Sequence, residues 1–316
     1  MSEERAMLAD TVAALVAKHA GPAAVRAAIE SEHGYDESLW QLLCEQVGAA
    51  ALVVPEELGG AGGQLADAAT VLQELGRALV PSPLLGTTLA ELALLAAGEP
   101  DEETLGALAE GSSIGALVLD PDYVVNGDIA DVVVAVEGGR LSRWTRFSAE
   151  PVTTMDLTRR LARLTPEETA ELGEDPGLAD AASILLAAEQ IGAAERCLDL
   201  TVEYTKSRVQ FGRPIGSFQA LKHRMADLYV TVAAAKAVVN DACNEPTGRN
   251  AAAARLAATE ALNIVAAEGI QLHGGIAITW EHDMHLYFKR AHGSAQLLDP
   301  PRELLRRLEP EILSKS

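Results

Sequence analysis

Several residue types that define whole classes of protein are scarce in this sequence. Its 316 residues include only Cys44, Cys197 and Cys243, and these form no CxxC pair. This spacing excludes a disulfide framework and a cysteine-ligated zinc site, and it favours a reducing, cytoplasmic compartment. The sequence also lacks the run of about 18 consecutive apolar residues that a transmembrane helix needs. We therefore expect no membrane-spanning segment.

Basic residues are scarce as well. Lys and Arg number 25 against 46 Asp and Glu, which gives a formal net charge of −21. A protein that binds nucleic acid needs a basic face to neutralise phosphates, and an anionic membrane surface attracts the same kind of face. The composition therefore predicts neither nucleic acid nor membrane as a partner. An anionic ligand would need a local group of arginines, backbone N–H groups or helix N-termini.

Helix-forming sequence fills most of the chain, in two blocks separated by a short β-rich stretch. Aromatic residues make up only 4%, and long runs of Ala, Leu, Glu and Arg favour helices. Four valines within Asp131–Val136, followed by the turn Glu137–Arg140, predict a strand, a turn and a second strand. We expect the β-rich stretch to end near Leu164. The predicted fold is mainly α with a small β middle domain: an N-terminal helical domain (1–112), a reduced β domain (113–165) and a C-terminal helical bundle (166–316).

The C-terminal block predicts three long helices joined by short turns, which pack antiparallel as in a four-helix bundle. The expected helices are Ala181–Ser207, Phe218–Cys243 and Arg249–Leu272. The segment between the first two carries the most informative motif, Arg208-Val209-Gln210-Phe211-Gly212-Arg213-Pro214-Ile215-Gly216-Ser217-Phe218-Gln219. Arg208 closes one helix and Gln219 opens the next. Arginine makes charge-assisted contacts to phosphate oxygens, and a helix start offers unpaired N–H groups. The motif suits a diphosphate ligand, although an ordinary turn with an exposed arginine is an alternative.

A second motif stands where the third long helix is expected to end, in Gln271-Leu272-His273-Gly274-Gly275. Paired glycines let a ligand approach the backbone closely, and Gln271 can both donate and accept hydrogen bonds. The alternative is a simple glycine cap at the helix C-terminus.

Taken together, the order RxxFGxPIxxFQ, about fifty residues and then QxxGG resembles the acyl-CoA dehydrogenase family. Further matching segments are Val54–Gly63, Asp156–Leu161, Met225–Tyr229 and Tyr287–Ala291, so that the resemblance extends over nearly the whole chain. The resemblance implies the fold of that family, with its N-terminal helical domain, middle β domain and C-terminal four-helix bundle.

It also implies a flavoprotein that uses FAD to oxidise an acyl-CoA between Cα and Cβ, with the flavin lying across a subunit interface. By position, Arg208 would pair with the FAD diphosphate. Phe211, Ile215 and Gln219 would line the adenosine side. Gln271, Gly274 and Gly275 would approach the diphosphate through amide and backbone groups.

Two features depart from the family. The middle domain is short and lacks the Tyr/Thr-Glu-Pro type of segment that frames the flavin. The family's two positions for the catalytic glutamate hold Leu298 and Ala182, neither of which can accept a proton. Asp299, Asp180 and Glu189 lie near these positions in sequence but are poor substitutes, so no catalytic residue is predicted. His282 and His285 lie in a segment where the family binds no metal, and none is predicted here.

These observations favour a subunit that completes a partner's FAD site. The chain resembles the smaller, non-catalytic subunit of the α₂β₂ acyl-CoA dehydrogenases of bacterial steroid catabolism, including cholesterol degradation. A larger catalytic subunit would supply the glutamate and most of the acyl-CoA pocket, which leaves room for a bulky acyl group. Two alternatives remain open: a self-sufficient homodimer with a displaced base, and a helical scaffold that binds no flavin.

Overall fold

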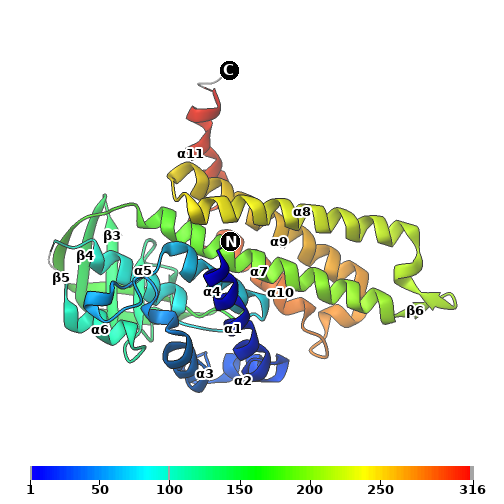
Figure 1. Ribbon diagram of the computed structural model, residues 1–316, viewed down its shortest axis with the longest axis horizontal. Coiled ribbons are helices and arrows are strands. Elements are labelled where there is room, and N and C mark those ends of the chain that lie inside the picture. Colours follow the sequence, from blue (N-terminus) through cyan, green and yellow to red (C-terminus); the bar gives the residue numbers. More distant parts are fainter. Residues whose placement is uncertain (1, 99, 314–316) are drawn as a thin grey trace.

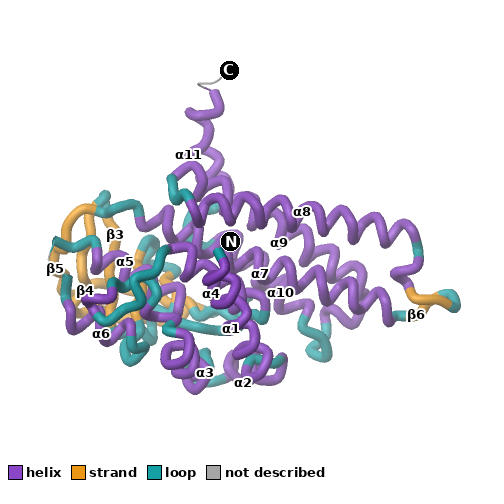
Figure 2. Tube along the Cα trace, viewed as in Figure 1, coloured by secondary structure: helices purple, strands orange, loops and turns teal. Residues whose placement is uncertain are grey.

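Helices dominate the chain, and in sequence a small sheet separates two helical blocks (Figures 1 and 2). A computed structural model describes residues 2–98 and 100–313, with the backbone alone described for residues 310–313. Figure 1 shows the sheet at one end of the molecule and the far ends of the long C-terminal helices at the other. The predicted fold class, mainly α with a small β middle domain, is confirmed.

The N-terminal block consists of helices whose ends carry recognisable caps. Ser2 accepts a hydrogen bond from the Arg5 N–H at the start of the first helix, and Pro22 occupies the first turn of the second. This second helix was not expected from the sequence. The helices are α1 (Glu3–His19), α2 (Pro22–Glu30), α3 (Glu37–Leu42), α4 (Leu65–Arg77), α5 (Leu84–Leu95) and α6 (Glu102–Ala109).

A five-stranded sheet follows, in the order β1-β3-β4-β5-β2. Its strands are β1 (Gly115–Val118), β2 (Val124–Val125), β3 (Val132–Glu137), β4 (Arg140–Val152) and β5 (Leu161–Glu174). β1 and β3 are parallel, and the other pairs are antiparallel. Gly138 and Gly139 both have positive φ, which the tight β3–β4 turn requires. Trp144 is buried on one face of the sheet with Val133 and Leu164.

The sheet extends beyond the end that the sequence predicted. We expected the β-rich stretch to end near Leu164, but β5 runs on to Glu174, so the predicted boundary at residue 165 falls inside this strand. The polar segment pairs with β4 alone, because β2 reaches only Leu161 and Ala162. Pro166 therefore lies on an edge, where its missing N–H costs no ladder hydrogen bond.

The C-terminal block is built on three long helices, as predicted, with ends within three residues of those expected. Its helices are α7 (Leu178–Ser207), α8 (Gln219–Asn244), α9 (Gly248–His273), α10 (Met284–Gln296) and α11 (Pro301–Leu313). Glycines let α4 and α7 approach closely: a Cβ on Gly192 would lie 1.8 Å from the Gln73 carbonyl oxygen, and one on Gly76 would lie 2.1 Å from that of Glu189.

One stretch, Gly248–Ile278, has the length and composition of a membrane span even though it contains no long uninterrupted apolar run. Within the described residues, Ala254, Leu262 and Val265 of this stretch are fully buried. α9 packs against α7, α8 and α10. The stretch is therefore accounted for as the core helix of the bundle.

Glu91 carries a fully buried carboxyl group on α5 that no hydrogen bond stabilises within the described residues. Its side chain is 0% exposed, and neither oxygen has a hydrogen-bond partner within the described residues. Burial raises the pKa of Glu91 well above its usual value, which favours the neutral form of this carboxyl in the folded protein. Glu91→Leu should stabilise the fold by about 1–3 kcal/mol, measured by urea unfolding near neutral pH.

The pH dependence provides a second readout. Because the folded pKa is raised, the native protein retains a proton that the unfolded chain releases above about pH 4.3. The stability of the parent protein should therefore fall, relative to that of Glu91→Leu, as pH rises from this value toward the folded pKa. The exposed Glu103 on α6 offers a matched control, since Glu103→Leu should change stability by less than about 0.5 kcal/mol. If Glu91→Leu were less stable than the parent protein, Glu91 would not be an unpaired carboxyl that destabilises the fold.

Candidate functional site

The two sequence motifs meet at one end of the helical bundle, although about fifty residues separate them. The C-terminus of α7 lies against the C-terminus of α9, where the rings of Tyr204 and His273 stack with centroids 4.3 Å apart. The first turns of α8 join the same end through an ion pair between Arg224 and Glu268. Figure 1 shows this end farthest from the sheet, around the label for β6.

The first motif forms a tight hairpin that projects from the bundle. Two short strands, β6 (Val209–Gln210) and β7 (Arg213–Pro214), pair across a turn at Phe211 and Gly212. Phe211 has φ +54° and is 92% exposed. A positive φ is costly for an aromatic residue, and such strain accumulates at functional sites. A strained, exposed phenylalanine is the kind of residue that a ligand or a partner subunit covers.

The hairpin and the start of α8 concentrate positive charge in an otherwise acidic protein. No Asp or Glu occurs between Glu203 and Asp227. Basic side chains near a helix N-terminus oppose the helix dipole, and the first N–H groups of α8 have no acceptor within the helix. An anion bound here would relieve both penalties. The basic residues of this segment are Lys206, Arg208, Arg213, Lys222 and Arg224.

Arg208 is the best placed of these residues to contact such an anion. It follows the last residue of α7, and its backbone carbonyl accepts a hydrogen bond from Ile215 N–H at 2.8 Å, which ties the two ends of the hairpin together. Its side chain is exposed and has no ion-pair partner in the part of the chain that the structure describes. Ile215 is half-buried, and Gln219 is exposed at the start of α8.

The second motif presents open backbone beside this cluster. Gln271 is exposed, and Gly274 follows α9 with φ +66° and ψ −146°, a conformation that favours glycine but differs from the αL conformation of a glycine cap. A Cβ added to Gly274 or Gly275 would meet nothing within 4 Å. Packing among the described residues therefore does not require a glycine at position 275. A glycine cap would concern position 274 alone, so it does not account for Gly275 either. Open backbone and free cations fit the diphosphate of a dinucleotide such as FAD.

A group of aromatic and histidine rings supports this end of the bundle. His273 donates from Nδ1 to the Gly269 carbonyl oxygen at 2.7 Å, and its ring centroid lies 4.5 Å from that of His282. Burial lowers the pKa of both histidines, so both are neutral at neutral pH. In residues 2–98 and 100–313, no group of three His, Cys, Asp or Glu side chains is arranged to hold a metal ion.

Leu298, which the family resemblance predicts at one of the two base positions, occupies a nearly filled site. It follows α10 with φ +61°, an uncommon backbone conformation for leucine. The buried Arg255 guanidinium donates to the Leu297 carbonyl oxygen at 3.0 Å and also to that of Ser294, which fixes this segment. Leu85, Leu89 and Leu298 border a cavity of about 30 Å³. A space of this size holds about one water molecule, far less than an acyl thioester needs.

Ala182, predicted at the other base position, and the three carboxylates named near these positions offer no free base. Ala182 is fully buried in α7. Asp180 and Asp299 both pair with Arg307. Glu189 is enclosed by two arginines: Arg159 lies at 2.5 Å, and Arg290 also forms an ion pair with it.

The environment of Glu189 keeps its carboxyl ionised. Burial alone would raise the pKa of Glu189, but Arg159 and Arg290 outweigh burial, and the net shift is downward. Arg290 also bonds to Asp156 at 2.8 Å. The segment Asp156–Leu161, between β4 and β5, thus connects the sheet to the bundle through buried charges. Sequence reasoning missed this network, and its only signal was an unusual density of charge in a segment between two strands.

Two family models match the chain: the acyl-CoA dehydrogenase N-terminal domain over residues 2–112 and the acyl-CoA dehydrogenase C-terminal domain over residues 178–297. Together with the fold and the paired motifs, these matches show that the chain belongs to the acyl-CoA dehydrogenase family. The acyl-CoA dehydrogenase IpdE2 of Mycobacterium tuberculosis H37Rv is 81% identical, over 98% of this chain and 98% of the relative. FadE34 of the same organism is 34% identical over 91% of this chain, which matches 45% of FadE34.

Solved structures of two-component complexes share the fold. The Tcur3481-Tcur3483 steroid ACAD G363A variant superposes with a TM-score of 0.89 at 27% identity, over 99% of this chain and 98% of the other. The ChsE4-ChsE5 complex from Mycobacterium tuberculosis superposes with a TM-score of 0.88 at 25% identity, with the same coverage.

Proposed function

We propose that this chain is the non-catalytic subunit of a heteromeric, FAD-dependent acyl-CoA dehydrogenase of the cytoplasm. The observation that carries the proposal is a contrast between two sites in one chain. The diphosphate motifs are intact, exposed and cationic, whereas aliphatic side chains hold both base positions and the cavity beside Leu298 measures about 30 Å³. Such a chain can complete a flavin site but cannot house or deprotonate an acyl-CoA.

A larger catalytic partner would provide what this chain lacks. Two of the similar solved structures are complexes of two named components, and one of them is called a steroid ACAD. FadE34 leaves more than half of its length beyond the match to this chain, enough for a second unit of this size. These likenesses support an α₂β₂ assembly with one FAD for each unlike pair. They also support a bulky, steroid-derived acyl-CoA, bound mainly in the partner's pocket.

In this assembly the chain acts by binding and orienting the cofactor. Arg208 would hold the diphosphate through its charge, and Gln271 with the backbone at Gly274 and Gly275 would also contact it. Phe211, Ile215 and Gln219 would line the adenosine end. The chemistry that bound FAD supplies is acceptance of the hydride that leaves Cβ, while the partner's carboxylate removes the proton from Cα.

Co-purification with a candidate catalytic chain tests the proposal. We expect the isolated chain to show little flavin absorbance near ~450 nm, and the complex to carry about one FAD per unlike pair. Native mass spectrometry of the same samples should give two copies of each chain. Stoichiometric FAD in the isolated chain, together with turnover of an acyl-CoA, would instead establish a self-sufficient homodimer.

A further inference from the structure

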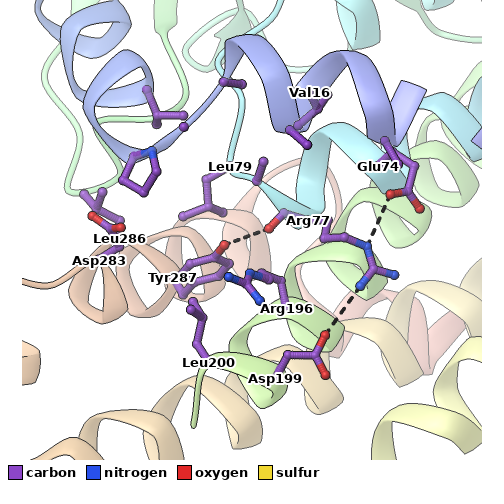
Figure 3. Close-up of a pocket in the computed structure, with 17 residues that line it drawn as sticks. Val16, Glu74, Arg77, Leu79, Arg196, Asp199, Leu200, Asp283, Leu286 and Tyr287 are labelled. Carbon is purple, nitrogen blue, oxygen red and sulfur yellow. Dashed lines mark hydrogen bonds and ion pairs between the residues drawn. The ribbon is translucent and has the colours of Figure 1, made fainter. Parts of the chain in front are cut away.

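A second hollow lies apart from the flavin half-site and from the space beside Leu298. It measures about 430 Å³ and lies where α1, α4, α7 and α10 meet (Figure 3). It shares no lining residue with either of those sites. Its volume is within the range of small-molecule sites, about 300–1,000 Å³.

The hollow exists because small residues line it where the chain turns sharply. α1 and α2 meet at an angle of 76° around Gly21 and Pro22. Larger aliphatic residues form the walls from other elements, with Val16 and Leu79 on one side and Leu200 and Leu286 on the other (Figure 3). The alanines that leave the space open are Ala13, Ala17, Ala20 and Ala78.

Most of the charges in this hollow are already matched. Arg77 pairs with Glu195 at 2.6 Å, with Glu74 at 3.3 Å and, more distantly, with Asp199 at 3.8 Å. Asp283 pairs with Arg26 at 2.5 Å. Apart from Arg196, the lining therefore presents no uncompensated cation of the kind that a phosphate or a coenzyme A would need.

Arg196 is the exception among these charged groups. Among the described residues its ion pair is to Glu203, at 3.3 Å, and that carboxylate is exposed to solvent. Its guanidinium lies beside the ring of Tyr287 (Figure 3), whose hydroxyl donates to the Arg77 carbonyl oxygen at 2.7 Å. Arg196 thus offers N–H donors at the edge of an apolar hollow. Three carboxylates in the same lining, from Glu74, Asp199 and Asp283, oppose an anion there.

We propose that this hollow binds an uncharged, hydrocarbon-rich molecule of about steroid size, with a carbonyl or hydroxyl oxygen directed at Arg196. The apolar body would be buried against Val16, Leu79 and Leu286. Arg196 would donate to the ligand oxygen without a full countercharge. The inference rests on this hollow alone and goes beyond the role proposed for the flavin half-site.

Calorimetric titration with 4-androstene-3,17-dione tests the site, using the chain alone and its complex with the catalytic partner. We expect saturable binding with a Kd of about 1–100 µM in both samples. Ala17→Trp at the mouth of the hollow should weaken binding at least about tenfold, and the smaller filler Ala13→Leu should act in the same direction. Ala14→Trp is the matched control, since Ala14 is exposed on α1 and does not line the hollow. Arg196→Gln should weaken binding about threefold to tenfold.

Three results would overturn the proposal. One is the absence of saturable binding up to the solubility limit of the probe. Another is equal binding by Ala14→Trp and Ala17→Trp. The third is loss of binding in the complex, which would make the hollow part of a subunit interface. Comparing dodecan-1-ol with dodecanoate tests whether the hollow prefers an uncharged ligand. We expect the alcohol to bind more tightly, and tighter binding of the carboxylate would refute the proposal that the ligand is uncharged. None of these readouts depends on flavin content, so failure here would leave the flavin proposal intact.

Discussion

Arg208→Ala should remove most of the FAD from the complex with the catalytic subunit. A charge-assisted hydrogen bond contributes about 1.5–3 kcal/mol, so the Kd for FAD should rise about 10- to 100-fold. The loss should be large because Arg208 is exposed with no ion-pair partner among the described residues, so its full charge is available to a bound diphosphate. Flavin absorbance per unlike pair and titration of the stripped complex with FAD measure the effect.

A surface arginine on the sheet provides the control. Arg146 is exposed and pairs with Glu167 and Glu168, far from the bundle end. Arg146→Ala should leave the flavin content unchanged, and Arg208→Lys should retain part of it, since lysine keeps the charge but loses the bidentate geometry. Gel filtration should show that the complexes with Arg146→Ala and Arg208→Lys remain intact. An unchanged flavin content in the Arg208→Ala complex would favour the alternative in which this chain is a helical scaffold that does not itself bind flavin.

Glu189→Ala is the second change with a large expected effect, and it acts on stability. Removing this carboxylate leaves Arg159 and Arg290 buried without their shared partner. Breaking a buried ion pair on one side costs about 3–5 kcal/mol, which urea unfolding of the isolated chain can measure. Glu203, exposed on the same helix and paired with Arg196, supplies the comparison: Glu203→Ala should cost less than about 1 kcal/mol.

The pH dependence distinguishes the structural role of Glu189 from a catalytic one. Because the folded pKa is lowered, the ion pairs contribute stability above the unfolded pKa of about 4.3, and this contribution is lost as pH falls through the folded pKa. Glu189→Ala should therefore flatten the acid limb of the stability profile. If Glu189→Gln abolished acyl-CoA oxidation by the isolated chain while leaving its stability unchanged, Glu189 would be a displaced base instead.

Local sequence signals were sufficient for most of the helices. Propensity and turn residues place the ends of α7, α8 and α9 within three residues of the structure, because each helix is long and ends at a glycine, a proline or a change in composition. They failed for α2, a nine-residue helix, and for the outer half of β5. Both are short-range ambiguities: Pro166-Glu167-Glu168 resembles a polar connection until β4 is seen to pair with it.

The candidate site shows the same limit. The resemblance to the acyl-CoA dehydrogenase family predicted Arg208, Gln219, Gln271 and Gly275 as binding residues and Leu298 and Ala182 at the base positions; all of these roles stay predictions. It did not show that the basic segment from Lys206 to Arg224 lies beside the open glycines. It also did not show that Glu189, named as a possible base, is enclosed by two arginines.

By itself, the sequence determined the helical fold with its small middle sheet, because each element depends on residues close together. It also predicted two binding motifs and aliphatic residues at the base positions, because these follow from a family pattern. Only the tertiary structure decided which charges are paired, how little space lies beside Leu298, and where α1, α4, α7 and α10 leave a hollow. These properties depend on contacts between residues as much as 257 positions apart, as between Arg26 and Asp283. No local pattern records such contacts, because burial and pairing are set by how whole elements pack.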